Sequence, residues 1–273
     1  MKRRLLIILF LILSCAEKQN TKIDTLESYL QSKFSHVAKI QNFYIAAGNS
    51  APLETDDPNA TAKDIFEMSI RIFESLLDQN EDGVVDNPEL LNSLAANLMF
   101  LIDHTDVTDI EEQKIQDRFG NYVMTMKSNI WPYMPDYHYS DCGLGITELH
   151  TSLWRPNTYN ALWEECFHTI TEAQNRIRTD YSFEPNSIMG TYMQNDIDAG
   201  TYDISEQNNL ENDGYDFNTG VNEYIHQVWL INLCGSTNIL NEYQMGILTH
   251  IENAGTPLTI NTNYDLELAK TVK

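Results

Sequence analysis

Asp78-Gln-Asn-Glu-Asp-Gly-Val-Val-Asp-Asn-Pro-Glu89 is an acidic segment between two stretches in which apolar residues recur at three- and four-residue steps. Its first, third, fifth, ninth and twelfth positions carry oxygen-bearing side chains, and its sixth position is a glycine. A calcium ion takes about six to eight oxygen ligands at flexible distances, and a loop of this length and spacing supplies them between two helices. The segment therefore predicts an EF-hand loop at residues 78–89, with a helix on each side.

The positions of this loop have separate expected parts in binding calcium. The expected ligands are the carbonyl of Val84 and the side chains of Asp78, Asn80, Asp82, Asp86 and Glu89, of which Glu89 is bidentate. Gly83 permits the sharp turn, and Val85 is expected to point into the core. The alternative is an acidic connecting turn without an ion. Calcium sensors usually pair two such loops, and this sequence has one, so we expect a structural calcium site.

Further outward, the apolar spacing predicts a mainly helical chain. Thr61 is placed to cap a helix that ends at the loop, and a second helix is expected from about Asn87 through Leu101. The same spacing predicts helices over residues 26–46, 109–119, 158–178 and 221–234, and a weaker helical stretch over 187–199. The segments that begin at Trp131 and Ser140 are typical of irregular structure, with room for a short strand. We therefore expect a mainly α fold with little or no sheet.

The N-terminal segment has the parts of a bacterial lipoprotein signal. Three basic residues follow the first methionine, an apolar run covers residues 5–13, and Cys15 comes after a serine. The apolar run is too short to cross a bilayer as a helix. We expect residues 1–14 to be removed and residues 15–24 to form a lipidated tether, which places the protein in the cell envelope, facing the periplasm or the exterior. An ordinary signal peptide with a coincidental cysteine is the alternative.

The charge of the chain excludes nucleic acid as a partner. The sequence has 17 basic and 40 acidic side chains, and three of the basic ones lie in the segment that is expected to be removed. The remaining 14 basic against 40 acidic side chains give a net charge near −26. Phosphate backbones and anionic headgroups repel such a polyanion, whereas cations concentrate at its surface. We therefore expect the N-terminal lipid to make the membrane contact, and calcium to be the natural counterion.

A first cluster of glutamate and histidine lies in Leu162-Trp-Glu-Glu-Cys-Phe-His-Thr-Ile-Thr-Glu172. Glu164 and His168 are four residues apart and share one face of the predicted helix, with Glu165 beside them. This is the spacing of the zinc motif H-E-x-x-H with Glu in the first position. In that motif the two outer residues bind zinc, and the inner Glu activates a water molecule as general base. Because zinc accepts carboxylate ligands, Glu164 and His168 are candidate ligands and Glu165 is a candidate base.

A second cluster lies in Asn222-Glu-Tyr-Ile-His-Gln-Val-Trp-Leu-Ile-Asn-Leu233, a predicted helix that is apolar on nearly every side. Such a helix is buried, and a buried glutamate must be paired or bind a metal. Glu223 follows His168 by 55 residues on a separate helix, as the third ligand does in zinc peptidases of the glutamate type. Glu223 and His226 also form a Glu-x-x-His pair, as do Glu165 and His168. Two such pairs are half the ligand set of a di-iron carboxylate bundle, which is an alternative.

The residues leave two further classes of function open. Solvated helix faces also carry Glu and His at these spacings, and a buried Glu also caps a backbone or pairs with His. The candidates are therefore a zinc-dependent hydrolase with a peptidase-like site, active or vestigial, and a non-catalytic surface-binding or scaffold protein whose calcium is structural. His150 is either a further ligand or a loop residue. A peptide or protein is the expected substrate or surface partner.

The calcium loop, Glu164-Glu-Cys-Phe-His-Thr-Ile-Thr171 and Asn222-Glu-Tyr-Ile225 together resemble a poorly characterised group of secreted proteins and lipoproteins. That group combines one EF-hand loop with a degenerate zinc-metallopeptidase-like helix, and the resemblance spans most of the mature chain. The resemblance implies Glu165 at the base position, with His168 and Glu223 at ligand positions. It implies no particular substrate. Glu164 stands where the peptidase motif has histidine.

The mature chain is long enough for one large domain or two small ones. We divide it into a helical region over residues 25–125, which includes the EF-hand loop, and a metallopeptidase-like helical region over residues 126–273. One continuous domain is the alternative. Besides the expected lipidation site, the chain has Cys142, Cys166 and Cys234. This odd number allows one disulfide and one free thiol, and the spacing does not select the pair.

Overall fold

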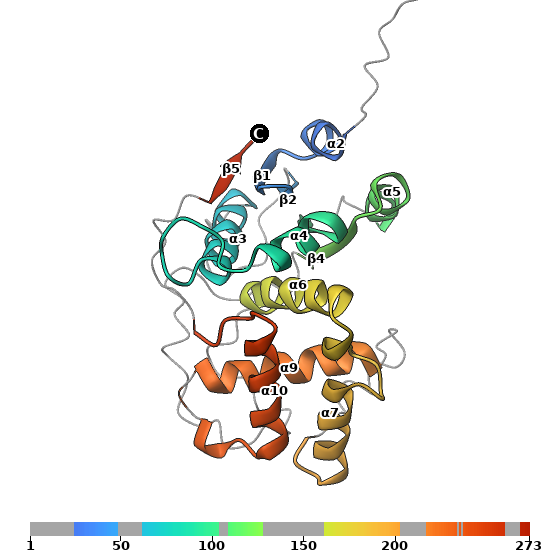
Figure 1. Ribbon diagram of the computed structural model, residues 1–273. Coiled ribbons are helices and arrows are strands. Elements are labelled where there is room, and N and C mark those ends of the chain that lie inside the picture. The colour runs from blue at the N-terminus through green and yellow to red at the C-terminus, as the bar shows by residue number, and fades with distance from the viewer. Residues whose placement is uncertain are drawn as a thin grey trace, which may run out of the picture.

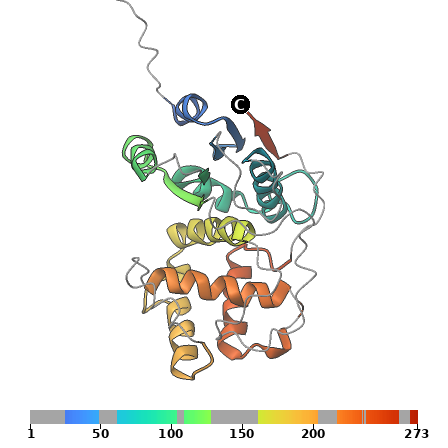
Figure 2. The same ribbon diagram turned by 180° about the vertical axis from the view of Figure 1, so that it is seen from behind.

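The computed structural model describes residues 25–48, 62–103, 109–127, 161–202, 217–233, 235, 237–259 and 268–273. A sheet with its covering helices forms one end of the molecule, and a group of helices forms the other end (Figure 1). Helix α6 (Ala161–Ile177) lies between the two ends, as Figures 1 and 2 both show. Because of this position, α6 contacts both the sheet layer and the helical layer.

The sheet has five strands in the order β4-β3-β2-β1-β5. These strands are β1 (His36–Ile40), β2 (Phe43–Ala47), β3 (Leu98–Asp103), β4 (Tyr122–Lys127) and β5 (Ala269–Thr271). β2, β3 and β4 run parallel, whereas β1 is antiparallel to both β2 and β5. The protein therefore has an α/β fold, and the predicted mainly α fold with little or no sheet is wrong.

The predicted helix over residues 26–46 is wrong beyond its first part. α2 (Leu26–Lys33) is helical, and the chain then forms the hairpin of β1 and β2. The tight turn of this hairpin has Gln41 at φ 53°, the left-handed conformation that a two-residue hairpin turn requires. Apolar residues continue the spacing of α2 into the hairpin, so the spacing alone fits a helix and a pair of strands equally well.

The predicted helix-loop-helix unit is confirmed. α3 (Ala62–Leu77) and α4 (Pro88–Asn97) lie on either side of the acidic loop. The second helix is shorter than predicted, because it ends at Asn97 and not at Leu101. The apolar run that follows is buried on both sides in β3. A parallel strand that is buried on both faces reads as a continuous apolar run, which a buried helix also does.

The remaining helices are α5 (Asp109–Phe119), α7 (Ile188–Asp198), α9 (Phe217–Leu233) and α10 (Glu242–Asn253), with short 3-10 turns at Thr179–Tyr181 and Thr237–Ile239. The predictions for α5, α6, α7 and α9 are confirmed to within a few residues. α10 has no counterpart among the helices predicted from the sequence, although Asn241 and Gln244 form a capping box at its start.

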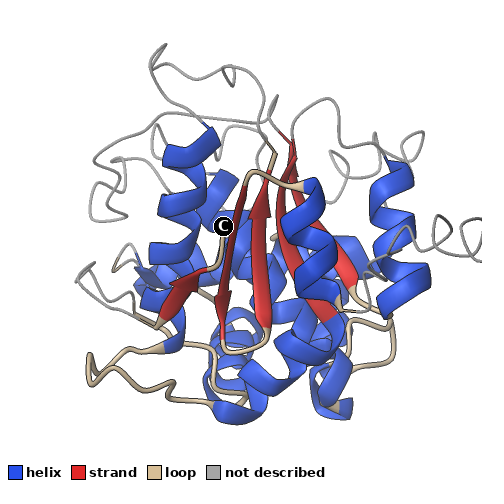
Figure 3. Cartoon of the chain, turned by 90° about the horizontal axis from the view of Figure 1, so that it is seen from above, coloured by secondary structure: helices blue, strands red, loops and turns tan. Residues whose placement is uncertain are grey.

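Two apolar clusters cover the two faces of the sheet. The larger cluster joins one face to α3, α4 and α6 and continues into α7, α9 and α10. The smaller cluster joins the opposite face to α2 and α5 through Leu30, Phe34 and Ile115. Figure 3 shows the helices on both sides of the strands. Since α6 belongs to the larger cluster, its polar side chains Glu164 and His168 are buried along with its apolar ones.

Several expectations concern residues outside the described ranges. These residues are the signal segment, the tether with Cys15, and also Cys142, His150 and Cys234. Within the described part of the chain, the helices are too short or too polar to cross a membrane. β5 pairs with β1, so segments from both of the expected regions, 25–125 and 126–273, contribute to one sheet.

Candidate metal centre

Four side chains from α6 and α9 converge where these two helices pack. Glu164 and His168 come from α6, and Glu223 and His226 come from α9. Each offers one ligand atom, and the four atoms lie within 4.8 Å of one another. Ligand atoms at about 2.1 Å from one zinc ion are roughly 3 to 4 Å apart, so a small contraction would let this group hold a metal ion. These four residues form the α6–α9 group.

Packing near the group fixes how α6 and α9 face each other. Phe167 stacks on Trp229 with a distance of 4.0 Å between ring centroids. The Thr171 hydroxyl donates a 2.6 Å hydrogen bond to Oδ1 of Asn222. α9 is buried over most of its length, as its apolar sequence predicts. In a close-packed interior both helices have little freedom to rotate, so the four side chains are held in place from two sides.

Each imidazole of the group has one nitrogen atom that lacks a hydrogen-bond partner among the described residues. His226 Nδ1 lies 3.3 Å from Glu164 Oε1, and His168 Nε2 lies 3.8 Å from Glu223 Oε2. Among the described residues, Nε2 of His168 and Nε2 of His226 are buried without a hydrogen-bond partner. Leaving a buried polar atom unsatisfied costs about 1 to 3 kcal/mol. The cost favours a bound ligand at these atoms, and imidazole and carboxylate are both donor types that zinc accepts.

The carboxylates of the group lie close together in a buried place. Burial raises the pKa of Glu223 well above its usual range, and the carboxylates of Glu164 and Glu165 raise it further. Burial lowers the pKa of His168 to about 4, an effect that Glu164 opposes and His226 strengthens. The surroundings therefore disfavour the charged forms of these side chains. A divalent cation would compensate the carboxylates and would bind the imidazoles in their neutral form.

Glu165 lies next to the group on α6 without being a member of it. Its side chain is half-buried. Burial raises the pKa of Glu165 to about 8, and the neighbouring Glu164 carboxylate contributes to the rise. A general base is most effective when its pKa lies near the operating pH. Glu165 is therefore in the right chemical range to exchange a proton beside the group.

One side of the group faces solvent. The exposed fraction of the side chain is 2% for His226 and 9% for Glu164. The corresponding fraction is 6% for His168 and 20% for Glu223. Solvent therefore reaches the group from the side of Glu223. The half-buried side chain of Glu165 is also in contact with solvent. The arrangement combines an enclosed imidazole side with a carboxylate side that water can approach.

Comparison with protein-family models, curated proteins and solved structures gives no match. The functional argument therefore depends on the residues themselves. The structure brings together Glu164, His168 and Glu223, the three residues that the sequence predicts as zinc ligands. It adds His226, which the sequence analysis used only for the di-iron alternative. The signal for His226 was its three-residue spacing from Glu223 on a buried helix.

Backbone amides surround the carboxylates of loop 78–89, the predicted EF-hand loop. The buried Asp78 carboxylate accepts hydrogen bonds from the backbone N–H groups of Asp82 at 3.2 Å and Gly83 at 2.8 Å. The Asp86 carboxylate accepts a 2.8 Å hydrogen bond from the Asn80 amide and one from the backbone N–H of Gln79. Gly83 has a φ of 78°, which suits the sharp turn expected at this position. These contacts curl the loop around its own acidic side chains.

The carboxylate of Glu89, at the twelfth position of the loop, does not converge with those of the other expected calcium ligands. Within the described ranges, the α6–α9 group is the one set of three or more His, Cys, Asp or Glu residues whose ligand atoms converge so closely. Glu89 is exposed in the first turn of α4. A hydrogen bond to Asp180 raises the pKa of Arg178, and the Glu89 carboxylate adds to this rise. The prediction that Val85 points into the core is confirmed, since Val85 is 7% exposed.

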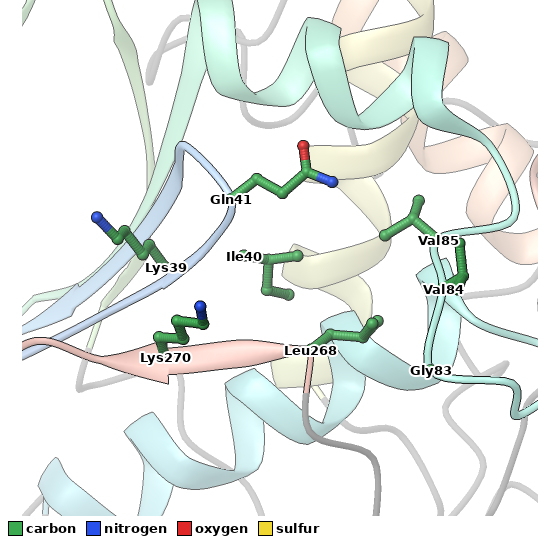
Figure 4. Close-up of a pocket in the computed structure, with 8 residues that line it drawn as sticks. All are labelled: Lys39, Ile40, Gln41, Gly83, Val84, Val85, Leu268 and Lys270. Atoms are coloured by element: carbon green, nitrogen blue, oxygen red, sulfur yellow. The ribbon is translucent and has the colours of Figure 1, made fainter.

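A cavity of about 360 Å³ lies against the calcium loop (Figure 4). Its walls are the β1–β2 turn, loop residues 83–85 and the residues that lead into β5. Ile40 and Leu268 supply apolar surface, Gln41 extends over the cavity, and Lys39 points away and pairs with Glu27. None of its lining residues belongs to the α6–α9 group. The cavity and the candidate metal centre are therefore separate features.

Proposed function

We propose that this protein is a metal-dependent hydrolase of the peptidase type, with a zinc ion held between α6 and α9. The observation that carries the proposal is the convergence of Glu164, His168, Glu223 and His226, in which two buried imidazole nitrogens have no hydrogen-bond partner among the described residues. Both donor types are ones that zinc accepts, and the group comes from two helices that packing holds firmly. The spacing of Glu164, Glu165 and His168 resembles the zinc-peptidase motif.

The residues divide into ligands and a base. Glu164, His168, Glu223 and His226 hold the ion, which would polarise a carbonyl group and make water easier to deprotonate. Glu165 accepts the proton of the attacking water and passes it to the leaving amine. The half-buried position of Glu165 and the 20% exposure of Glu223 leave a side from which a substrate can approach. The substrate class is a peptide or protein segment.

Anchoring and calcium complete the proposed function. The N-terminal signal and Cys15 would attach the protein to a membrane of the cell envelope, so its substrates would be extracytoplasmic. Calcium in loop 78–89 would join α3 to α4 as a permanent structural ion. Extracellular modules of this kind bind calcium at about 0.1 to 1 mM, so the loop would stay largely filled outside the cell.

A second candidate is a non-catalytic protein with a structural metal. The observation that favours it is the number of ligands in the α6–α9 group, because four protein ligands can complete a tetrahedral zinc site. Catalytic zinc keeps a position open for water. In the hydrolase one of the two carboxylates must therefore yield its place or the ion must expand its coordination. The two candidates differ in whether Glu165 matters.

Metal content and hydrolysis together test the proposal. The purified protein should contain zinc near one ion per chain, measured by elemental analysis after expression with ample zinc, iron and manganese. It should hydrolyse a mixed peptide library, as followed by mass spectrometry. Glu165→Gln should keep the zinc and lose the hydrolysis. Zinc without hydrolysis supports the structural metal, iron at two per chain supports the di-iron alternative, and absence of any transition metal contradicts the proposal.

A further inference from the structure

Asn87, at the end of the calcium loop, and Gln174, on α6, both donate hydrogen bonds to the backbone carbonyl of Ala254. Asn87 is the last residue before α4, and its Oδ1 accepts a 3.0 Å hydrogen bond from the backbone N–H of Leu90. The amide nitrogen of the same side chain donates to the carbonyl of Ala254 at 3.3 Å. Gln174 on α6 donates to that same carbonyl at 3.0 Å. Asn87, Ala254 and Gln174 form the Ala254 clamp.

The clamp is fitted tightly at the end of α10. Gly255 has a φ of 85°, and a Cβ atom there would collide with the Asn87 amide. The Thr256 hydroxyl donates a 2.5 Å hydrogen bond to Oε1 of Gln174, so both ends of the Gln174 amide are held by the segment after α10. Gln174 is fully buried. A shift of Asn87 therefore either breaks its contact with Ala254 or moves the α10 end, and with it the Gln174 side chain.

Calcium would set the position of Asn87 directly. Asn87 follows Asp86 and precedes Glu89 by two residues, and both of these are expected calcium ligands. With the ion bound, the chain on either side of Asn87 is fixed. The negative charges of the loop carboxylates repel one another, so loss of the ion would loosen the chain on both sides of Asn87. The cap of α4 therefore lies between two expected ligands and would follow their positions.

A second contact joins the same two helices. Ser93 on α4 is buried, and its hydroxyl donates a 2.9 Å hydrogen bond to the carbonyl of Ala173 on α6. Ala173 and Gln174 lie five and six residues after His168 on one continuous helix. A displacement of α4 therefore reaches the metal centre through the rigid body of α6.

We propose that calcium in loop 78–89 strengthens zinc binding by the α6–α9 group, through the Ala254 clamp and the contact of Ser93 with α6. This inference rests on the proposed function, since it assumes both ions. Coupling between two binding sites is reciprocal, so zinc strengthens calcium binding by the same factor. Calcium would then govern loading of the metal centre, with the complete site assembled only where calcium is abundant.

The zinc dissociation constant of the purified wild-type protein, with and without calcium, is the first test. It should be measured with a chromophoric zinc indicator below one equivalent of zinc, in metal-stripped buffer with no calcium or with about 5 mM calcium. Calcium should tighten zinc binding by about 5- to 150-fold, the usual range of coupling between sites. Glu89→Gln should reduce this factor toward one, because it removes the bidentate calcium ligand.

Two variants and one matched control test the route. Asn87→Ala and Gln174→Ala should each reduce the calcium effect on zinc affinity toward one. Gln31→Ala is the control: it removes a similar hydrogen bond from a side-chain amide to the Val272 carbonyl, outside the clamp, and should keep the wild-type factor. An equal zinc affinity with and without calcium in wild type overturns the inference and leaves the proposed function standing. No zinc binding at all overturns the proposed function, and a full calcium effect in both clamp variants overturns the clamp.

Discussion

The α6–α9 group differs from the zinc-peptidase motif that α6 resembles in where its second imidazole comes from. Glu164 stands where the motif has histidine, and His226 on α9 supplies an imidazole instead. The motif would place an imidazole at the position of Glu164, and this chain has a carboxylate there. α9 brings the imidazole of His226 to within 3.3 Å of that carboxylate. The group therefore keeps two imidazoles, one from each helix. An additional carboxylate lowers the net positive charge of a bound zinc ion and weakens its ability to acidify water, so a base such as Glu165 matters more.

Substitution of the individual ligands should separate metal binding from catalysis. His168→Ala, Glu223→Ala and His226→Ala should each weaken zinc binding by more than about tenfold to 100-fold, the range for residues that only support ligands. Glu165→Gln should bind zinc as wild type does. Isothermal titration with zinc measures both effects. His250→Ala, a half-buried histidine on α10, is the control and should retain zinc. Normal zinc binding by His226→Ala would remove His226 from the ligand set.

Asp196 is a buried carboxylate that four neutral donors stabilise. It is fully buried on α7. Its oxygens accept hydrogen bonds from the side chains of Tyr224 at 2.6 Å, Gln244 at 2.6 Å, Asn241 at 2.6 Å and Thr201 at 3.0 Å. These donors come from α9, from α10 with its N-cap, and from the end of α7. Asp196 therefore joins the three helices below α6.

Loss of this acceptor should destabilise the fold strongly. In Asp196→Asn the new NH2 group meets the amide NH2 of either Gln244 or Asn241, which cannot accept from it. The substitution also removes the negative charge, and hydrogen bonds to a charged group contribute about 1.5 to 3 kcal/mol each. The free energy of unfolding should fall by about 2 to 4 kcal/mol, measured by urea denaturation followed by circular dichroism. Asp198→Asn, at the exposed end of α7, should change it by less than about 0.5 kcal/mol. Equal stability of the two variants would contradict the role of Asp196.

Most of the described helices were predictable from this sequence, with α10 as the exception, whereas the strands were not. The helices α5, α6 and α9 have spacing, charge and length that only a helix fits. β2 is apolar throughout, and β3 is apolar up to its last residue, Asp103. Both are buried between helices on both faces, so they have no alternation to reveal a strand. β5 is short and half-exposed, and it forms only because β1 offers a free edge from a distant part of the chain. Such pairing depends on tertiary contacts that local patterns do not contain.

The sequence predicted three of the four residues of the α6–α9 group and the kind of ion that they would bind, but it did not predict that His226 joins them. Spacing placed Glu164 and His168 on one helix face, and burial singled out Glu223 on another. Which faces of α6 and α9 meet is decided by packing between Phe167 and Trp229, which no spacing along one helix predicts. For this reason His226 entered the group only when the two helices were seen together.

Calcium should stabilise the helix-loop-helix unit, and Glu89 should be required for the effect. At about 10 mM calcium, a dissociation constant of about 0.1 to 1 mM corresponds to a stabilisation of roughly 1.4 to 2.7 kcal/mol. For a protein of this size the melting temperature should rise by about 3 to 10 °C. Scanning calorimetry with and without calcium measures the shift, which Glu89→Gln should largely abolish. Glu81→Gln, at an exposed loop position that is no expected ligand, should keep it. A wild-type protein that calcium leaves unchanged would show that the loop binds no calcium.

The charge of the protein bears on how it can be held at a membrane. The sequence carries a net charge of −23, and removal of residues 1–14, as we propose, would leave 14 basic against 40 acidic side chains, a net charge near −26. Anionic headgroups repel a polyanion, and at physiological salt the repulsion acts over about 8 Å. Within the described residues no helix can span the bilayer. In the proposed function the lipid on Cys15 supplies the attachment, and the net charge opposes any further binding to anionic headgroups.

Membrane attachment should depend entirely on Cys15. Two or more acyl chains give stable anchoring, and each buried methylene contributes about 0.8 kcal/mol, so loss of the lipid cannot be offset by a negatively charged surface. Cells that express the full sequence should incorporate a tagged fatty acid into wild type and into Cys142→Ala, but not into Cys15→Ala. After fractionation at low salt, where weak basic patches would bind most strongly, Cys15→Ala should leave the membranes completely. Labelling of Cys15→Ala at the wild-type level would place the lipid on another residue. Retention of the unlabelled variant on membranes would instead reveal an attachment that does not depend on lipid, through an uncleaved apolar run at residues 5–13 or through a surface on the folded part of the chain.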